Sequence, residues 1–144
     1  MGEEITTVKR VLEDFMRRVK GVTCYPDKLR VYAPTCYGKC EHIVKDLRKR
    51  LDYIFKGSTT YDAEGCWVYY DKEKGKWERE CEPVKVIEIA TFCLTPDKAK
   101  KFIDGLIWYA TRAKQYSIAV ENGQFYIAET EEMLKALKES LKKK

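Results

Sequence analysis

Two β-rich segments decide the fold: residues 58–70, STTYDAEGCWVYY, and residues 76–92, KWERECEPVKVIEIATF. Both are rich in Val, Ile, Thr, Tyr and Trp, the residue types that favour half-buried strands. The polar stretch Lys72-Glu73-Lys74-Gly75 between them is typical of a hairpin loop, and it would set Asp71 opposite Lys76. We therefore predict that the two segments form one long antiparallel hairpin in the middle of a sheet.

The register of this hairpin can be counted outward from its loop. It places Cys66 opposite Cys81, an arrangement that a cross-strand disulfide can bridge. It also sets Asp62 opposite Lys85 as an ordinary cross-strand ion pair. Because Pro83 has no backbone N–H, we expect it to require a bulge or an edge position in the second strand.

Helical and extended patterns alternate around the hairpin. Helices are predicted over residues 4–20, 40–56, 96–114 and from Thr130 onward, and strands over residues 28–33, 117–121 and 124–128. Without the two outer helices, the order is strand, helix, strand, strand, helix, strand, which is the split βαβ of a ferredoxin-like α+β sandwich. We expect an antiparallel sheet with two helices on one face, and the other face left to solvent, to the terminal helices or to a second subunit.

The chain is expected to form a single domain over residues 1–144. An N-terminal helix (1–21) precedes the ferredoxin-like core (28–128), and a basic C-terminal helix (130–144) follows it. The composition agrees with one compact domain, since 44% of the residues are hydrophobic and 35% are charged, with a net charge of +5.

Two local signals mark the ends of elements in the second half of the chain. Thr95-Pro96-Asp97 combines an N-cap residue, a proline at the first helical position and an acid near the positive end of the helix dipole. Asn122-Gly123 is the strongest short hairpin signal in the chain. A two-residue turn at that site predicts one shared face for four apolar side chains: Ile118, Val120, Phe125 and Ile127.

Composition also bears on source and location. No apolar run approaches the roughly 18 residues that a membrane span needs, and the first residues lack the pattern of a secretory signal. We therefore expect a cytoplasmic protein without a membrane partner. The 20 Lys and 15 Glu against 2 Gln and 1 Asn indicate a thermophilic, archaeal type of source.

Six cysteines stand at positions 24, 36, 40, 66, 81 and 93, without a Cys-x-x-Cys pair. Intracellular proteins of hyperthermophiles form disulfides, so we predict the hairpin disulfide and a second bond from Cys24 to Cys36 or Cys40. The alternative is that all six are small buried hydrophobic residues. Cys36, Cys40 and His42, with Cys24, are weak candidates for metal ligands because their spacing is irregular. We expect neither a metal nor a cofactor.

The hairpin carries the candidate site. Asp62 and Glu64 are the candidate acid–base pair if the protein is an enzyme. An aromatic–acidic platform, which could bind a cationic or sugar-like ligand, shares one face in the counted register: Trp67, Tyr69, Glu78 and Glu80. The alternative is structural, since Trp and Tyr favour half-buried strands and carboxylates pair across strands.

A known pattern is present at the start of the hairpin. Residues 57–67, GSTTYDAEGCW, match Gly-x-Thr-x-x-Asp-Ala-x-Gly-x-Trp at six positions: Gly57, Thr59, Asp62, Ala63, Gly65 and Trp67. This pattern resembles a family of small uncharacterised bacterial proteins, many of them lipoproteins, and the similarity covers roughly residues 28–121. The resemblance implies an α+β domain of unassigned activity. This chain differs in its cysteines, its terminal helices and the lack of a lipoprotein signal, so an envelope location is not implied.

The sequence supports three hypotheses on function. The leading one is a non-enzymatic binding or assembly protein, homodimeric through an exposed sheet face or a hairpin edge. The first alternative is an accessory nucleic-acid-binding protein of a plasmid or virus of heat-loving archaea, using basic residues of the second helix: Lys45, Arg48, Lys49 and Arg50. Acidic residues interrupt that set, as on an ordinary solvated helix. The second alternative is a small-substrate enzyme that uses Asp62 and Glu64.

Overall fold

The computed structural model describes residues 2–21, 27–91 and 95–142, and these contain four helices and five strands. The helices are α1 (Gly2–Arg18), α2 (Glu41–Phe55), α3 (Pro96–Arg112) and α4 (Thr130–Lys142). The strands are β1 (Asp27–Pro34), β2 (Thr59–Asp71), β3 (Lys76–Thr91), β4 (Ser117–Asn122) and β5 (Gln124–Glu129). None of these four helices has both the length and the apolar content that crossing a membrane requires.

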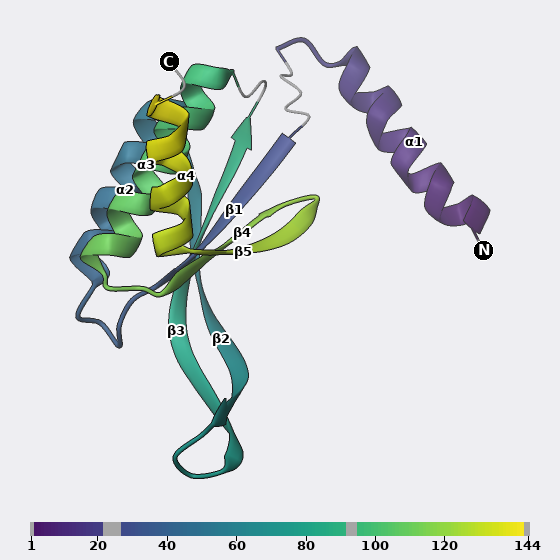
Figure 1. Cartoon of the computed structure of the whole chain (residues 1–144). Helices are drawn as coiled ribbons and strands as arrows, with labels where there is room; N and C mark the ends of the chain where they lie inside the picture. The colour runs from purple at the N-terminus through teal and green to yellow at the C-terminus, as the bar shows by residue number, and fades with distance from the viewer. Residues whose placement is uncertain (1, 22–26, 92–94, 143–144) are drawn as a thin grey trace.

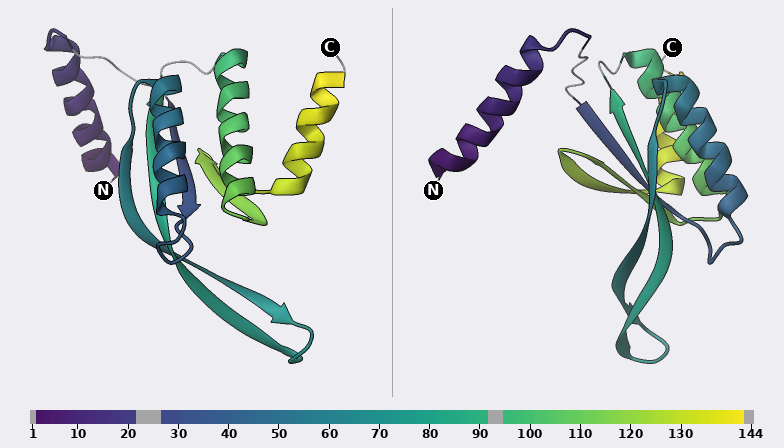
Figure 2. Two further views of the ribbon diagram at one scale, coloured as in Figure 1. Left: turned by 90° about the vertical axis from the view of Figure 1, so that its left-hand side faces the viewer. Right: turned by 180° about the vertical axis from the view of Figure 1, so that it is seen from behind.

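The strands form one antiparallel sheet in the order β2-β3-β1-β4-β5. Helices α2, α3 and α4 cover one face of it, and α1 stands on the other side, apart from the sheet (Figures 1 and 2). The predicted ferredoxin-like α+β arrangement is confirmed in β1 to β4 with α2 and α3, and β5 adds a strand beside β4. We call the face without α2, α3 and α4 the open face.

The core lies between the sheet and the helices that cover it. Alternate residues of β1 point into it, so that Leu29, Val31 and Ala33 are buried. On the helix side, α2 and α3 approach each other closely at Gly105, where a Cβ atom would lie 3.7 Å from Cδ1 of Leu47. This distance is an ordinary van der Waals contact, so α2 and α3 pack against each other here through the Leu47 side chain.

The long hairpin has the predicted register, and it contains no bulge. Pairing is continuous along all of β2, with Cys66 opposite Cys81, and β1 pairs with β3 only as far as Val84, so of the two alternatives predicted for Pro83 the edge position holds and the bulge does not. The carbonyl oxygen of Pro83 accepts the N–H of Thr35 at 3.1 Å, just past the end of β1. The backbone N and C=O of one strand residue point to the same side, so the N of Pro83 also faces the side of β1. Because β1 has already ended there, the lack of an N–H at Pro83 removes no hydrogen bond between the two strands.

The β4–β5 hairpin is present, but the predicted face of two side chains is wrong. The strands pair up to the residues on either side of Gly123, which alone forms the tip with a φ of 72°. This differs by one residue from the two-residue turn, and such a shift moves every side chain of the second strand to the other face. Phe125 and Ile127 therefore lie on the open face, whereas Ile118 and Val120 face the helices.

The second disulfide joins Cys36 to Cys40, so the predicted bond from Cys24 to one of them is wrong. Cys36, Tyr37 and Gly38 have left-handed backbone angles, with φ of 53°, 55° and 93°. This tight turn brings the two cysteine Cα atoms to 5.2 Å, within bridging distance. Cys24 itself lies outside the described residues.

Helix starts agree in part with the sequence signals. The hydroxyl of Thr95 accepts the N–H of Lys98 at 3.2 Å, which confirms the predicted N-cap of α3. Thr130 begins α4 as expected, but its hydroxyl donates to the carbonyl of Gln115 at 2.6 Å. The start of α4 is thus tied to the segment before β4, which fixes α4 over the same face of the sheet as α3.

Replacing Leu47 with alanine tests the packing of α2. Leu47 is fully buried, so Leu47→Ala should lower the free energy of unfolding by about 2–5 kcal/mol through lost burial and a cavity. Ile103→Ala on α3, where the side chain is 42% exposed, should cost about 1 kcal/mol or less. Urea unfolding followed by circular dichroism measures both. Equal losses would contradict a core centred on α2.

Candidate functional site

A row of mostly apolar side chains crosses all five strands on the open face. Direct pairing aligns Tyr61 of β2, Val86 of β3, Tyr32 of β1, Ala119 of β4 and Ile127 of β5, which we call the apolar row. Its two ends are the most accessible, since Tyr61 is 44% exposed and Ile127 is 67% exposed. Between them Val86 is only 1% exposed, so the exposed apolar surface of the row lies at its two ends. Sequence analysis missed the row because it depends on the order of the strands.

A charged cluster borders the apolar row. Arg30 donates from Nε to Glu88 at 2.7 Å and from Nη1 to Glu121 at 2.9 Å. Lys28 Nζ lies 3.3 Å from Glu88, and the Tyr32 hydroxyl donates to Glu121 at 3.0 Å. The hydrogen bonds from Arg30 hold the pKa of both carboxyl groups below the usual value, and burial raises the pKa of Tyr32. The two cations and two anions cancel, so this border carries no net charge.

Beyond the end of β1, β2 and β3 continue as a two-stranded arm, residues 65–82 (Figure 1). The predicted disulfide Cys66–Cys81 is confirmed, and it closes the base of the arm. The hydroxyl of Tyr37 donates to the carbonyl of Cys81 at 2.8 Å, which ties the base to the turn before α2. One face of the arm carries Tyr70 and Trp77, whose rings meet edge to face with centroids 5.5 Å apart.

The other face of the arm continues the open face and carries the predicted platform. Trp67 lies opposite Glu80 and Tyr69 opposite Glu78, so the four residues share one face as predicted. The Tyr69 hydroxyl donates to Glu80 at 2.9 Å, and this bond raises the pKa of Tyr69. Glu78 has lysine ammonium groups at 3.4 and 3.8 Å. Ligand binding by the platform stays a prediction.

Glu82 is the next carboxylate on this face, and the sequence prediction did not include it. It lies opposite Gly65, and burial, with a smaller contribution from Glu80, raises the pKa of Glu82. Among the described residues, no lysine or arginine nitrogen lies within 4.0 Å of the carboxylate of Glu80 or of Glu82. These two carboxylates share a face with the exposed indole of Trp67, and together they form a surface suited to positive charge. We call Trp67, Tyr69, Glu78, Glu80 and Glu82 the acidic face of the arm.

Asp62 and Glu64 lie on the opposite, helix-side face of β2. Asp62 forms the predicted ion pair with Lys85, and its side chain is 82% exposed. Glu64 is also exposed, opposite Pro83, and its Oε1 lies 3.6 Å from Sγ of Cys66. The structure thus places the two carboxylates on one strand face in solvent, and their acid–base role stays a prediction.

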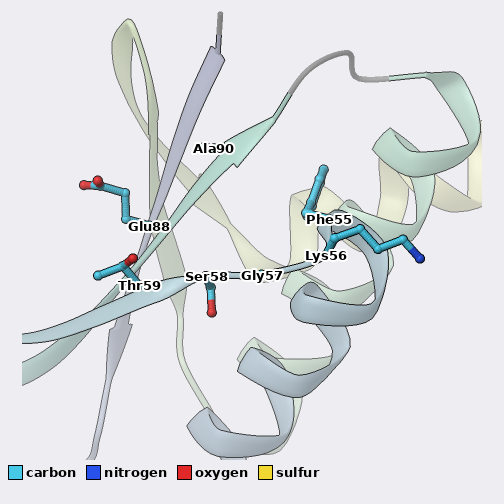
Figure 3. Close-up of a pocket in the computed structure, with 7 residues that line it drawn as sticks. All are labelled: Phe55, Lys56, Gly57, Ser58, Thr59, Glu88 and Ala90. Atoms are coloured by element: carbon cyan, nitrogen blue, oxygen red, sulfur yellow. The ribbon is translucent and has the colours of Figure 1, made fainter. Parts of the chain in front are cut away.

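A shallow hollow of about 230 Å³ lies where α2 leads into β2. It is lined by Phe55, Lys56, Gly57, Ser58, Thr59, Glu88 and Ala90. Figure 3 shows that its two charged side chains, Lys56 and Glu88, point away from each other. Binding and catalysis of small molecules require polar groups that converge on one point. This hollow does not offer that arrangement.

The predicted nucleic-acid candidates on α2 have separate environments. Arg48 donates to the hydroxyl and the carbonyl of Ser58 at 3.1 and 3.4 Å. Arg50 stacks 4.0 Å from the ring centroid of Trp108 on α3, and Arg112 lies 5.4 Å from the same centroid. The two lysines of the set are exposed. Trp108 and Arg112 were missed, although their spacing of four residues on a helix signals such a contact. Nucleic-acid binding stays a prediction.

The weak metal candidates have another role. Cys36 and Cys40 are joined to each other, so they cannot supply two thiolates to a site with His42, and that alternative is wrong. Glu64, Cys66 and Cys81 place one potential ligand atom each within 4.8 Å of one another, but both sulfurs belong to the disulfide of the arm. The four cysteines of the described residues thus form two disulfides, one in the turn before α2 and one across the base of the arm.

Comparison with known proteins shows the fold. No protein-family model and no curated sequence matches this chain. A phage SAM lyase in complex with S-methyl-5′-thioadenosine superposes with a TM-score of 0.53 at 20% identity, over 77% of this chain and 95% of the lyase chain. A phage SAM lyase in the apo state superposes with a TM-score of 0.49 at 20% identity, over 72% of this chain and 88% of the lyase chain. A Bacillus cereus protein related to NIF3 superposes with a TM-score of 0.38 at 19% identity, over 67% of this chain and 24% of that protein. This chain is thus similar in fold to the first lyase structure.

Replacing Arg30 tests the charged cluster. The folded-state pKa values of Glu88 and Glu121 lie below their ordinary 4.5, so the stabilisation that Arg30 provides is full above that pH. It is lost as the pH falls through the folded values. We therefore expect wild type to melt at a higher temperature than Arg30→Met near pH 7, with a difference that shrinks near pH 3. A difference that stays constant between these two pH values would contradict the assignment.

Removing the arm disulfide tests whether the arm is a separate structural unit. A bond that closes a loop of this length, with a sequence separation of 15, stabilises by about 3 kcal/mol. We expect the double variant C66S/C81S to exchange its amide hydrogens faster over residues 67–80, measured by mass spectrometry. Exchange in β1 should not change, because β1 pairs with β3 outside the arm. Faster exchange in β1 would show that the bond supports the whole sheet.

Proposed function

We propose that this protein is a binding and assembly protein that pairs with a second copy of itself through the open face of its sheet. The observation that carries the proposal is the apolar row, which crosses all five strands on the side that α2, α3 and α4 leave uncovered (Figure 1). The fully buried centres of protein interfaces are apolar and rich in aromatic residues. Tyr61 and Tyr32 meet this description on the open face.

Helix α1 supports the same proposal. Its apolar stripe consists of exposed residues at helical spacing, and it continues to Val19 just beyond the last helical residue: Val8, Val11, Leu12, Phe15, Met16 and Val19. Phe15, in the middle of the stripe, is 60% exposed. Most of the stability of a helix in a protein comes from packing its apolar face rather than from intrinsic propensity. The stripe therefore requires a partner surface, and α1 stands on the open-face side of the sheet (Figure 2).

The arm adds exposed aromatic surface to this side of the molecule and to its edge. Trp67 is 42% exposed, and Trp77 on the opposite face of the arm is 69% exposed. Trp and Tyr are enriched among the residues that contribute most to binding energy. A rigid arm, closed at its base by a disulfide, presents these side chains without a large entropic cost of ordering.

A second candidate is a small-substrate enzyme that uses Asp62 and Glu64. The fold shared with the phage SAM lyase favours it. SAM carries a sulfonium cation, so the protein should be incubated with SAM and the mixture analysed for S-methyl-5′-thioadenosine. Product that disappears in D62N/E64Q would favour this candidate over assembly.

Charging the two ends of the apolar row tests the assembly proposal. Burying an unpaired carboxylate is costly, so Y61E/I127E should weaken self-association by about 100-fold. Size-exclusion chromatography with light scattering over a dilution series should give a dimer for wild type and a monomer for this variant. The matched control is Tyr53→Glu on α2, where the side chain is 84% exposed, and it should remain dimeric. A wild type that is monomeric throughout the series would overturn the proposal.

A further inference from the structure

We infer that α1 of one copy of the chain lies along the acidic face of the arm of a second copy. This inference rests on the proposed self-association and names the contact that orients the two copies. It assigns a partner surface to the apolar stripe of α1 and a cationic partner to the acidic face.

The charges of the two surfaces are complementary. At about 100° per residue, Arg18, the last residue of α1, borders the apolar stripe, and Lys20 lies two residues beyond the end of the helix. Within the described part of the chain, neither side chain has a carboxylate oxygen within 4.0 Å. No lysine or arginine nitrogen of the described residues lies within 4.0 Å of the carboxylate of Glu80 or of Glu82. Two cations beside an apolar stripe thus match two carboxylates beside the exposed ring of Trp67.

The dimensions of the two surfaces agree. The stripe from Val8 to Val19 is about 17 Å long at 1.5 Å per residue. The stretch of β2 from Ala63 to Tyr69 is about 20 Å long at 3.3 Å per residue. Within it, Gly65 has no side chain of its own, and Val84 Cγ2 packs over its backbone, where a Cβ atom would lie at 3.2 Å. One helix can therefore lie along the strand with its stripe over the aromatic rings and its cations over the glutamates.

A second copy of the chain can make this contact without stretching the connection to β1. β1 begins at Asp27, which pairs with Thr91 at the end of β3 remote from the arm. Glu80 precedes Thr91 by eleven residues, about 36 Å along the strand. The seven residue steps from Lys20 to Asp27 reach at most about 25 Å. Lys20 of the same chain therefore reaches Glu80 only if this whole connection and both side chains are almost fully extended, whereas a second copy is free of this limit.

Two charge-reversed variants, used alone and mixed, test the inference. R18E/K20E reverses the charge at the end of α1, and E80K/E82K reverses the charge of the acidic face of the arm. Each variant alone places like charges together, so each should self-associate about 100-fold more weakly than wild type. An equimolar mixture should form a heterodimer with affinity near that of wild type, because each reversed helix then meets a reversed arm. Analytical ultracentrifugation measures all three, and circular dichroism checks that both variants fold.

The controls separate this inference from the proposal on which it rests. K45E/K49E on α2 changes the charge by the same amount as R18E/K20E, and it should leave self-association unchanged. If the mixture fails to pair, the inference is overturned. If only the quadruple variant R18E/K20E/E80K/E82K recovers, α1 docks on its own chain and the inference is again wrong. If both charge reversals leave the dimer intact while Y61E/I127E dissociates it, assembly stands and α1 binds elsewhere.

Discussion

The structure depends on the unbroken antiparallel register of β2 and β3. Because side chains alternate between faces along a strand, a shift of one residue would exchange the two faces of the whole hairpin. The observed register directs Ile87 and Ile89 into the core and sets Tyr61 beside Val86 on the open face. It also gathers three glutamates on one face of the arm. The acidic face is thus a consequence of this one pairing, and the core and the apolar row depend on it as well.

This register could be predicted because it depends on local sequence. A polar loop of four residues fixed the pairing of Asp71 with Lys76, and alternation carried it outward to the disulfide and the Asp62–Lys85 pair. The order of helices and strands followed from hydrophobic periodicity in the same way. The four members of the predicted platform share a face for the same reason, since their arrangement requires only the two strands of the hairpin.

Other features could not be predicted, because they depend on backbone angles or on distant strands. Gly123 alone forms the turn, whereas the dipeptide Asn122-Gly123 predicts a turn of two residues. This difference of one residue places Phe125 and Ile127 on the open face. Left-handed angles at Cys36 and Tyr37 have no signature in the sequence, because neither residue is a glycine or asparagine, the types that adopt such angles most readily. The apolar row joins residues from five strands, so it exists only once the strand order is known.

In the proposed association, the two parts of the open face contribute differently. The apolar row lies beside Arg30 and Lys28, whose charges are balanced by Glu88 and Glu121, so this part of the face offers burial without a net field. In the acidic face of the arm, no lysine or arginine of the described residues pairs with Glu80 or Glu82, so the field of this face acts at a distance on an approaching partner. Electrostatic complementarity contributes mainly to orientation and association rate, whereas apolar burial contributes mainly to affinity. A partner would therefore be oriented by the arm before it is held by the sheet.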